Sequence, residues 1–142
     1  EAVGPAFKIT ETMEEFIKRS NERFIFVFNA RDMAPLMRAS HIAFTAVGTT
    51  VYELAYMGVP SVLIGNYETD AQDLATLHEL GISRSLGYYR DLNPADISEA
   101  AESFRDNPAS WTEMSLKARN LTDGDGAARI AALIRALIKQ QN

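Results

Sequence analysis

The stretch that decides the fold is "HIAFTAVGTTVYELAYMGVPSVLIGN", residues 41–66. It contains an apolar strand over 41–46, a turn of small residues, a helix over 51–58 and a second apolar strand over 61–65. Gly58 stands where a left-handed helix C-cap belongs. Because the connections are short and a helix separates the strands, the stretch predicts two parallel strands joined by a right-handed crossover.

The same alternation continues on both sides of this stretch. We expect a strand end and turn at "AVGPAF", a helix over 10–22 capped by Thr10, a strand over 23–28 buried on both faces, a loop and short helix over 29–40, a helix over 69–81 and an edge strand over 82–87. This pattern predicts the α/β class, with a Rossmann-like parallel sheet and helices on both faces.

Three further helices are expected after the sheet, over 93–106, 107–121 and 126–140. Asn93-Pro94 and Asn107-Pro108 each indicate an N-cap followed by proline at the first helical position. The last helix carries one apolar stripe: Ile130, Leu133, Ile134, Leu137 and Ile138. We therefore predict a single domain over 1–142 with a helical tail over 93–140.

Composition excludes several classes of protein. The chain has 142 residues, 46% of them apolar, 23% charged and none cysteine, and its net charge is −5. A net negative charge disfavours nucleic-acid binding, and the lack of cysteine excludes disulfides and thiolate metal sites. No apolar run approaches the ~18 residues that a membrane helix needs. We expect a cytoplasmic protein with no metal, no cofactor and no membrane span.

Gly48, Thr49 and Thr50 lie between a predicted strand and a predicted helix. The free N–H groups of a helix N-terminus attract phosphate, and glycine lets a ligand approach the backbone. The alternative is structural, since Thr49 could simply cap the helix. The spacing matches neither a Walker loop nor a GxGxxG motif, so the turn alone does not decide between the two interpretations.

Two more polar groups are expected near this turn. Glu53 either complements the macrodipole in the first turn of the helix or accepts hydrogen bonds from a pair of ribose hydroxyls. Thr69 and Asp70 are candidate helix caps, whereas Gln72 offers both a donor and an acceptor to a sugar. Because the loops at 29–32, 46–50 and 65–70 all follow strands, we expect them at one edge of the sheet.

No catalytic residue is predicted. His41 and His78 have no obvious nucleophile or orienting carboxylate nearby in the sequence, so we expect structural roles for both. The segment "LTDGDGAAR", residues 121–129, lacks the run of oxygen ligands that a calcium loop requires. It is more typical of a turn followed by a helix cap.

Residues 33–87 resemble the C-terminal domain of GT-B-fold sugar-nucleotide enzymes. The resemblance rests on G-T-T-x-Y-E-L-A-x-x-G-V-P at 48–60, a strand, then Gln72 and a helix ending in Gly81. "VGPAF" and "LTDGDGAARI" are similar to other parts of these families. The groups it most resembles are the spore-coat polysaccharide biosynthesis type and the UDP-sugar hydrolase of pseudaminic acid synthesis. A more distant likeness is to the peptidoglycan N-acetylglucosaminyltransferase.

The resemblance implies a role for each candidate residue. Gly48, Thr49 and Thr50 would face the diphosphate of a UDP-sugar, and Glu53 would hold its ribose hydroxyls. Gln72 and Thr69 would approach the donor sugar. Asn29, with the residues up to Met33, would border the nucleobase.

The resemblance also implies missing parts. A first strand ending in a Gly-Gly loop would precede "VGPAF", and an N-terminal domain would supply the acceptor site and the catalytic base. We therefore expect a fragment that is truncated at its N-terminus, that binds nucleotide weakly and turns nothing over, and that can self-associate through an exposed sheet edge.

Three functions remain open from the sequence. The first is the nucleotide-sugar-binding half of a glycosyltransferase of surface polysaccharide or glycan biosynthesis. The second is a UDP-sugar hydrolase of the same fold in nonulosonic acid synthesis. The third is a non-catalytic binding or scaffolding module.

Overall fold

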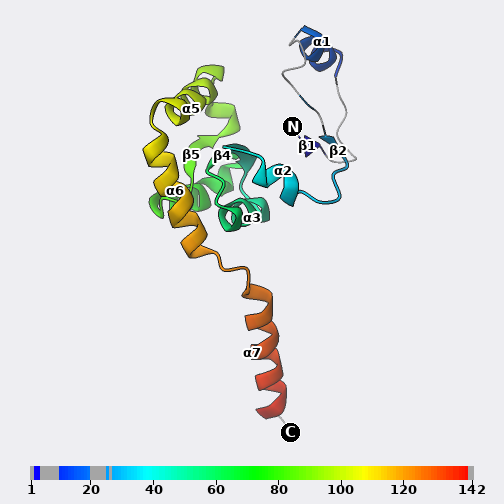
Figure 1. Ribbon diagram of the computed structural model, residues 1–142, viewed down its shortest axis with the longest axis vertical. Helices are drawn as coiled ribbons and strands as arrows, with labels where there is room; N and C mark the ends of the chain where they lie inside the picture. The colour runs from blue at the N-terminus through cyan, green and yellow to red at the C-terminus, as the bar shows by residue number, and fades with distance from the viewer. Residues whose placement is uncertain (1, 4–9, 20–24, 26, 141–142) are drawn as a thin grey trace. The chain divides into compact units, whose positions relative to one another are not determined.

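A computed structural model describes residues 2–3, 10–19, 25 and 27–140 (Figure 1). The chain divides into two compact units, Glu1–Leu36 and Met37–Asn142. In the first unit, β1 (Ala2–Val3) pairs in parallel with β2 (Val27–Phe28), and α1 spans Glu11–Arg19. The Thr10 hydroxyl accepts the N–H of Met13 at 3.3 Å, which confirms the predicted cap.

The strand predicted over 23–28 is only partly described. Residues 23, 24 and 26 lie outside the described part, and β2 comprises Val27 and Phe28. Phe28 is 51% exposed, so the expectation of a strand buried on both faces is wrong for this residue. The reason is that a two-stranded sheet offers its edge residues little to pack against within its own unit.

The second unit is built on a parallel sheet of order β3-β4-β5, with strands Ala43–Ala46, Ser61–Gly65 and Arg84–Tyr88. The pairing of β4 with β5 is irregular between Leu63 and Ile64. Because all three strands are parallel, their carboxyl ends lie along one edge of the sheet. The predicted α/β class with a parallel sheet is confirmed.

Helices cover both faces of this sheet, as predicted. On one face, Leu63 packs with residues of α3 (Thr49–Met57), α4 (Ala71–Glu79) and α6 (Pro108–Leu121). On the other face, Val62 packs with Ala100 of α5 (Pro94–Asp106) and Trp111 of α6. Adjacent strand residues point to opposite faces, so Val62 and Leu63 each anchor one core.

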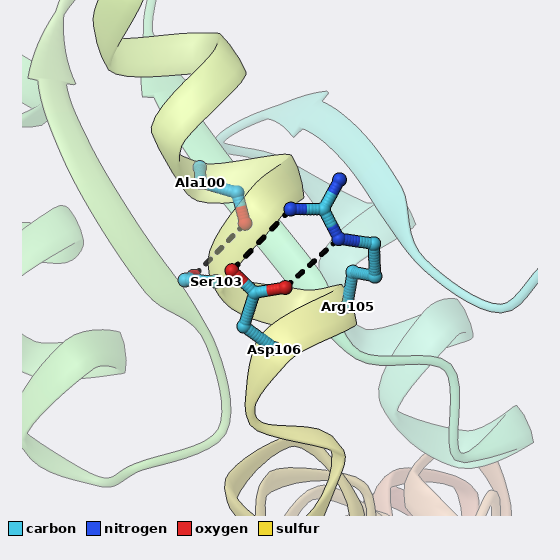
Figure 2. Close-up of polar contacts among 4 residues, drawn as sticks. All are labelled: Ala100, Ser103, Arg105 and Asp106. Atoms are coloured by element: carbon cyan, nitrogen blue, oxygen red, sulfur yellow. Dashed lines mark hydrogen bonds and ion pairs between the residues drawn. The ribbon is translucent and has the colours of Figure 1, made fainter.

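The second unit also contains two short 3₁₀ helices, η1 (Glu68–Asp70) before α4 and η2 (Tyr89–Asp91) after β5. The short helix α2 (Ala34–Arg38) spans the boundary between the two units in the sequence. The predicted caps of α5 and α6 are confirmed, since Asn93 accepts the N–H of Ala95 and Asn107 that of Ser110. Ser103 of α5 donates to the carbonyl of Ala100 (Figure 2). Its hydroxyl also accepts from Arg84 of β5. This link helps to hold α5 against the sheet.

The last helix, α7 (Gly126–Gln140), has the predicted apolar stripe. Its large side chains, Ile130, Leu133, Ile134 and Leu137, are each more than half exposed. None of the helices in the described part of the chain is both long and apolar enough to span a membrane.

Candidate functional site

The turn between β3 and α3 follows the carboxyl end of β3. β3 ends at Ala46 and α3 begins at Thr49, two residues earlier than the sequence predicts. Gly48 is the N-cap residue, with an extended backbone (φ 162°, ψ −170°) and no side-chain cap. The interpretation of Thr49 as a simple helix cap is therefore wrong, because Thr49 is already the first helical residue.

The N-terminus of α3 is open above Gly48. A Cβ atom added at Gly48 would meet nothing within 4 Å, and Gly48 itself is exposed. An extended φ is accessible to any residue, so backbone conformation does not require glycine here. The first N–H groups of a helix have no intrahelical partner and form the positive end of the macrodipole. The turn therefore combines a helix N-terminus that has no side-chain cap with open space above Gly48.

A cavity of about 280 Å³ adjoins the turn. Gly48 and Tyr52 line one side, while Asp73 and Thr76 of α4 line the other. The remaining lining residues are apolar: Val47, Leu77, Leu80 and Leu121. The cavity therefore has polar groups near the helix N-terminus and an apolar wall.

Gln72 is connected to this cavity through Thr76. The Gln72 amide lies 3.4 Å from the Thr76 hydroxyl, which donates in turn to the carbonyl of Gln72 at 2.8 Å. Gln72 and Thr69 are both exposed. Gln72 thus contacts Thr76, which lines the cavity beside Gly48.

Glu53 does not lie in the first turn of α3. Since α3 begins at Thr49, Glu53 is its fifth residue, and the first turn contains no acidic side chain. The macrodipole effect fades within one turn, so it explains Glu53 poorly. Glu53 lines a second cavity of about 310 Å³ with Tyr52, Tyr56 and Met57 of α3 and with Thr122 and Gly124.

Tyr52 lines both cavities and so joins Gly48 to Glu53 along one side of α3. The sequence alone does not mark Tyr52, Asp73 or Thr76 as site residues. Tyr52 and Tyr56 are exposed aromatic residues four positions apart on one helix, and this spacing was the available signal.

Asp70 fixes the loop that follows β4. Its carboxylate accepts the N–H groups of Asn66 and Tyr67 at 2.8 and 3.0 Å. Its side chain makes no cap bond to α4 itself. Asp70 is the N-cap residue of α4, as predicted, but its carboxylate holds the preceding loop instead of bonding the first N–H groups of the helix.

Asn29 follows β2 in the first unit and is exposed, with a left-handed backbone (φ 52°). Asparagine adopts this conformation more readily than most residues. Its predicted place at a nucleobase stays a prediction.

No pair of ionised side chains is described at this site. The ion pairs of the described residues join Arg105 to Asp106, Lys117 to Glu113 and Arg129 to Asp123. Among the same residues, no three His, Asp or Glu side chains gather closely enough to hold a metal ion. The polar chemistry described at the site therefore consists of backbone N–H groups, hydroxyls, an amide and separate carboxylates.

Comparisons with known proteins give two matches. The chain is 26% identical over 133 residues to the spore coat polysaccharide biosynthesis protein SpsG of Bacillus subtilis (strain 168), covering 90% of this chain and 39% of that protein. A Listeria monocytogenes crystal structure that carries the name UDP-N-acetylglucosamine 2-epimerase matches 95% of this chain and 36% of its own, with a TM-score of 0.68 and 21% identity. No family model matches the chain.

Both matches extend over nearly the whole chain and so include the parallel sheet. The chain spans well under half the length of either protein. At 21% identity, the structural match bears on the fold alone, and it extends over nearly the whole chain. The chain is thus a distant relative of SpsG, and its fold matches one part of a GT-B-type chain.

Proposed function

We propose that this chain is the nucleotide-sugar-binding domain of a GT-B-type enzyme that uses a UDP-sugar in polysaccharide biosynthesis. The observation that carries the proposal is the open N-terminus of α3, which has no side-chain cap and free space above Gly48. Its position at the carboxyl end of a parallel strand is where ligands of such sheets bind. The relation to a polysaccharide biosynthesis protein supports the same substrate class.

Each residue has a role in this proposal. The N–H groups of Thr49 and Thr50, with their hydroxyls, bind the diphosphate. Glu53 accepts hydrogen bonds from the two ribose hydroxyls, and Tyr52 lines the cavities at both positions. Gln72 and Thr69 contact the sugar. The transferase reaction is proposed for the whole enzyme, which joins the sugar to an acceptor.

Calorimetric titration with UDP, UMP and inorganic pyrophosphate tests the proposal. We expect UDP to bind more tightly than UMP, because the second phosphate engages the helix N-terminus. Glu53→Ala should weaken UDP binding about tenfold or more, the cost of losing hydrogen bonds to a charged group, and leave pyrophosphate binding unchanged.

Glu79→Ala is the matched control, because Glu79 is also an exposed helical glutamate and is not among the residues that line the cavity beside Gly48. It removes the same charge, so it should leave UDP binding as it is. Equal losses in the two variants, or no UDP binding at all, would contradict the proposal.

A further inference from the structure

A third cavity, of about 290 Å³, lies between α4 and the edge strand β5. Its apolar floor is formed by Ala71, Leu74 and Ala75 of α4. Its polar and aromatic lining residues are Tyr67, Glu68, His78, Ser85 and Tyr88. None of these residues lines the cavities beside α3, so this is a separate place on the domain.

Local contacts hold the rim of this cavity in position. Asp70 fixes the backbone of Tyr67 through its N–H group. The ring of Tyr88 packs edge-on against Tyr89, with centroids 5.0 Å apart and an interplanar angle of 82°. Such contacts restrict the aromatic rings before any ligand arrives, and this lowers the entropic cost of binding.

His78 is oriented by the neighbouring strand. Its Nδ1 lies 3.4 Å from the N–H of Ser85 and is positioned to accept it. A neutral imidazole that accepts at Nδ1 carries its proton on Nε2, so the ring keeps one donor for a ligand.

The hydroxyl of Tyr88 is a second polar group on the rim, and it hydrogen-bonds the side chain of Tyr89. Desolvation raises the pKa of Tyr88, and the charges of Tyr89, Glu68 and Asp91 raise it further. The hydroxyl therefore stays protonated at neutral pH. Glu68 provides a hydrogen-bond acceptor, because a carboxylate accepts hydrogen bonds and donates none.

These groups define the ligand. An apolar floor with aromatic rings suits the C–H face of a ring, and a rim with an imidazole, a hydroxyl and a carboxylate suits hydroxyl groups. Glu68 puts a carboxylate in the lining itself, which disfavours phosphates and sugar acids at this place. Small-molecule pockets usually measure about 300–1,000 Å³. At about 290 Å³ this cavity lies at the lower end, so its volume suits a single ring.

We propose that the cavity between α4 and β5 binds a single uncharged sugar ring, separately from the UDP-sugar site. The site is small and preformed. Gly87 lines it with a left-handed backbone (φ 97°) and with nothing within 4 Å of an added Cβ, which leaves the ligand space at this strand residue.

Amide NMR titration of the whole chain with methyl glucoside, methyl N-acetylglucosaminide and methyl glucuronide tests this proposal. We expect the two neutral sugars to shift the amides of Ala75, Ser85 and Gly87. The glucuronide should bind more weakly than the glucoside, because its carboxylate meets Glu68. No shift at these amides with either neutral sugar, or a glucuronide that binds as well as the glucoside, would overturn the proposal.

Two variants and a control separate a binding role from a structural one. Tyr88→Ala and Glu68→Ala should each weaken the neutral sugar about tenfold, by loss of an aromatic contact or of a charge-assisted hydrogen bond. Glu79→Ala should not, because Glu79 is exposed and does not line this cavity. If Tyr88→Ala fails to fold, Glu68→Ala still decides: sugar affinity equal to that of Glu79→Ala overturns the proposal.

The outcome is independent of the UDP site. Gly48→Ala should leave the sugar titration unchanged, and Glu68→Ala should leave the UDP titration unchanged. A UDP-sugar that shifts the amides of Thr49 and Thr50 but not those of Ser85 and Gly87 indicates that the sugar ring bound here is free or part of a glycan. Failure of the UDP titration alone leaves this proposal standing, and the reverse also holds.

Discussion

The two ends of α3 are built in opposite ways, although each carries a glycine. At the C-terminal end, Gly58 has a left-handed backbone (φ 70°), and its N–H donates to Ala55 while that of Val59 donates to Leu54. This is a Schellman motif, which satisfies the last carbonyl groups. Ser115 of α6 donates to the carbonyl of Gly58 itself.

At the N-terminal end, Gly48 has an extended backbone, no side-chain cap and no neighbour where a Cβ would stand. At Gly58, an added Cβ would clash with the stem of the Arg119 side chain. The fold therefore accounts for Gly58 by conformation and packing and accounts for Gly48 by neither. We propose that a ligand approaching the helix N-terminus supplies the missing reason.

The largest expected effect is that of Gly48→Ala on UDP affinity. The new methyl group enters the open space over the N–H groups, so UDP should bind about tenfold to a hundredfold more weakly, as when hydrogen bonds to a charged group are lost. Calorimetry measures the affinity. The free energy of unfolding should stay within about 0.5 kcal/mol, as for surface substitutions in general. An unchanged UDP affinity would remove the functional reason for Gly48.

Gly58→Ala should do the reverse. A left-handed backbone costs an alanine about 1–2 kcal/mol, and the stem of Arg119 must also move. Urea denaturation should show this loss of stability, whereas UDP affinity measured well below the unfolding transition should hold. If Gly48→Ala destabilised the chain as much as Gly58→Ala, the contrast between the two ends would be wrong.

Asn93→Ala tests the contrast between two helix N-termini. Asn93 accepts the N–H of Ala95 at 2.8 Å, and Asp96 accepts the N–H of Asn93 at 2.7 Å. Loss of such a cap costs about 1 kcal/mol. Thr49→Ala should cost much less, because Thr49 caps nothing. Thermal unfolding of the two variants compares them directly, and equal losses would restore Thr49 as a structural residue.

The smallest effect concerns the last turn of α5, where the Arg105 guanidinium hydrogen-bonds Asp106 and holds the pKa of that carboxyl below its usual value (Figure 2). A lowered folded pKa stabilises the fold above the unfolded pKa, and this is lost as the pH falls through the folded pKa. Both side chains are well exposed, so the effect on stability should be small.

Carboxyl NMR titration measures the pKa of Asp106 directly. Arg105→Gln should return the pKa of Asp106 to its usual range. A pKa that is the same in the two proteins would show that the ion pair does not form in solution.

The sequence predicted the elements whose causes are local. Asn-Pro pairs placed the starts of α5 and α6, and Gly58 placed the end of α3, because capping depends on neighbouring residues. The alternation of strands and helices was enough to predict the parallel sheet and its two covered faces. Element starts were less accurate, as at Thr49, because helix propensity does not mark the first turn sharply.

Features that depend on tertiary contacts escaped the sequence. Asp70 holds the preceding loop, and only the folded loop brings the N–H groups of Asn66 and Tyr67 to its carboxylate. His78 was expected to be structural, but its place in the cavity between α4 and β5 depends on the packing of α4 against β5. The position of Tyr52 between two cavities likewise needed the folded surfaces of α4 and the end of α6.

The most direct test of the central claim is an amide NMR titration of the chain with UDP, with uridine as the matched ligand without phosphate. We predict that UDP shifts the amides of Gly48, Thr49 and Thr50 strongly, that uridine does not, and that the amides of Gly58 and Val59 stay unchanged with both. If UDP binds and leaves the amides of Gly48, Thr49 and Thr50 unperturbed, the N-terminus of α3 is not the phosphate site.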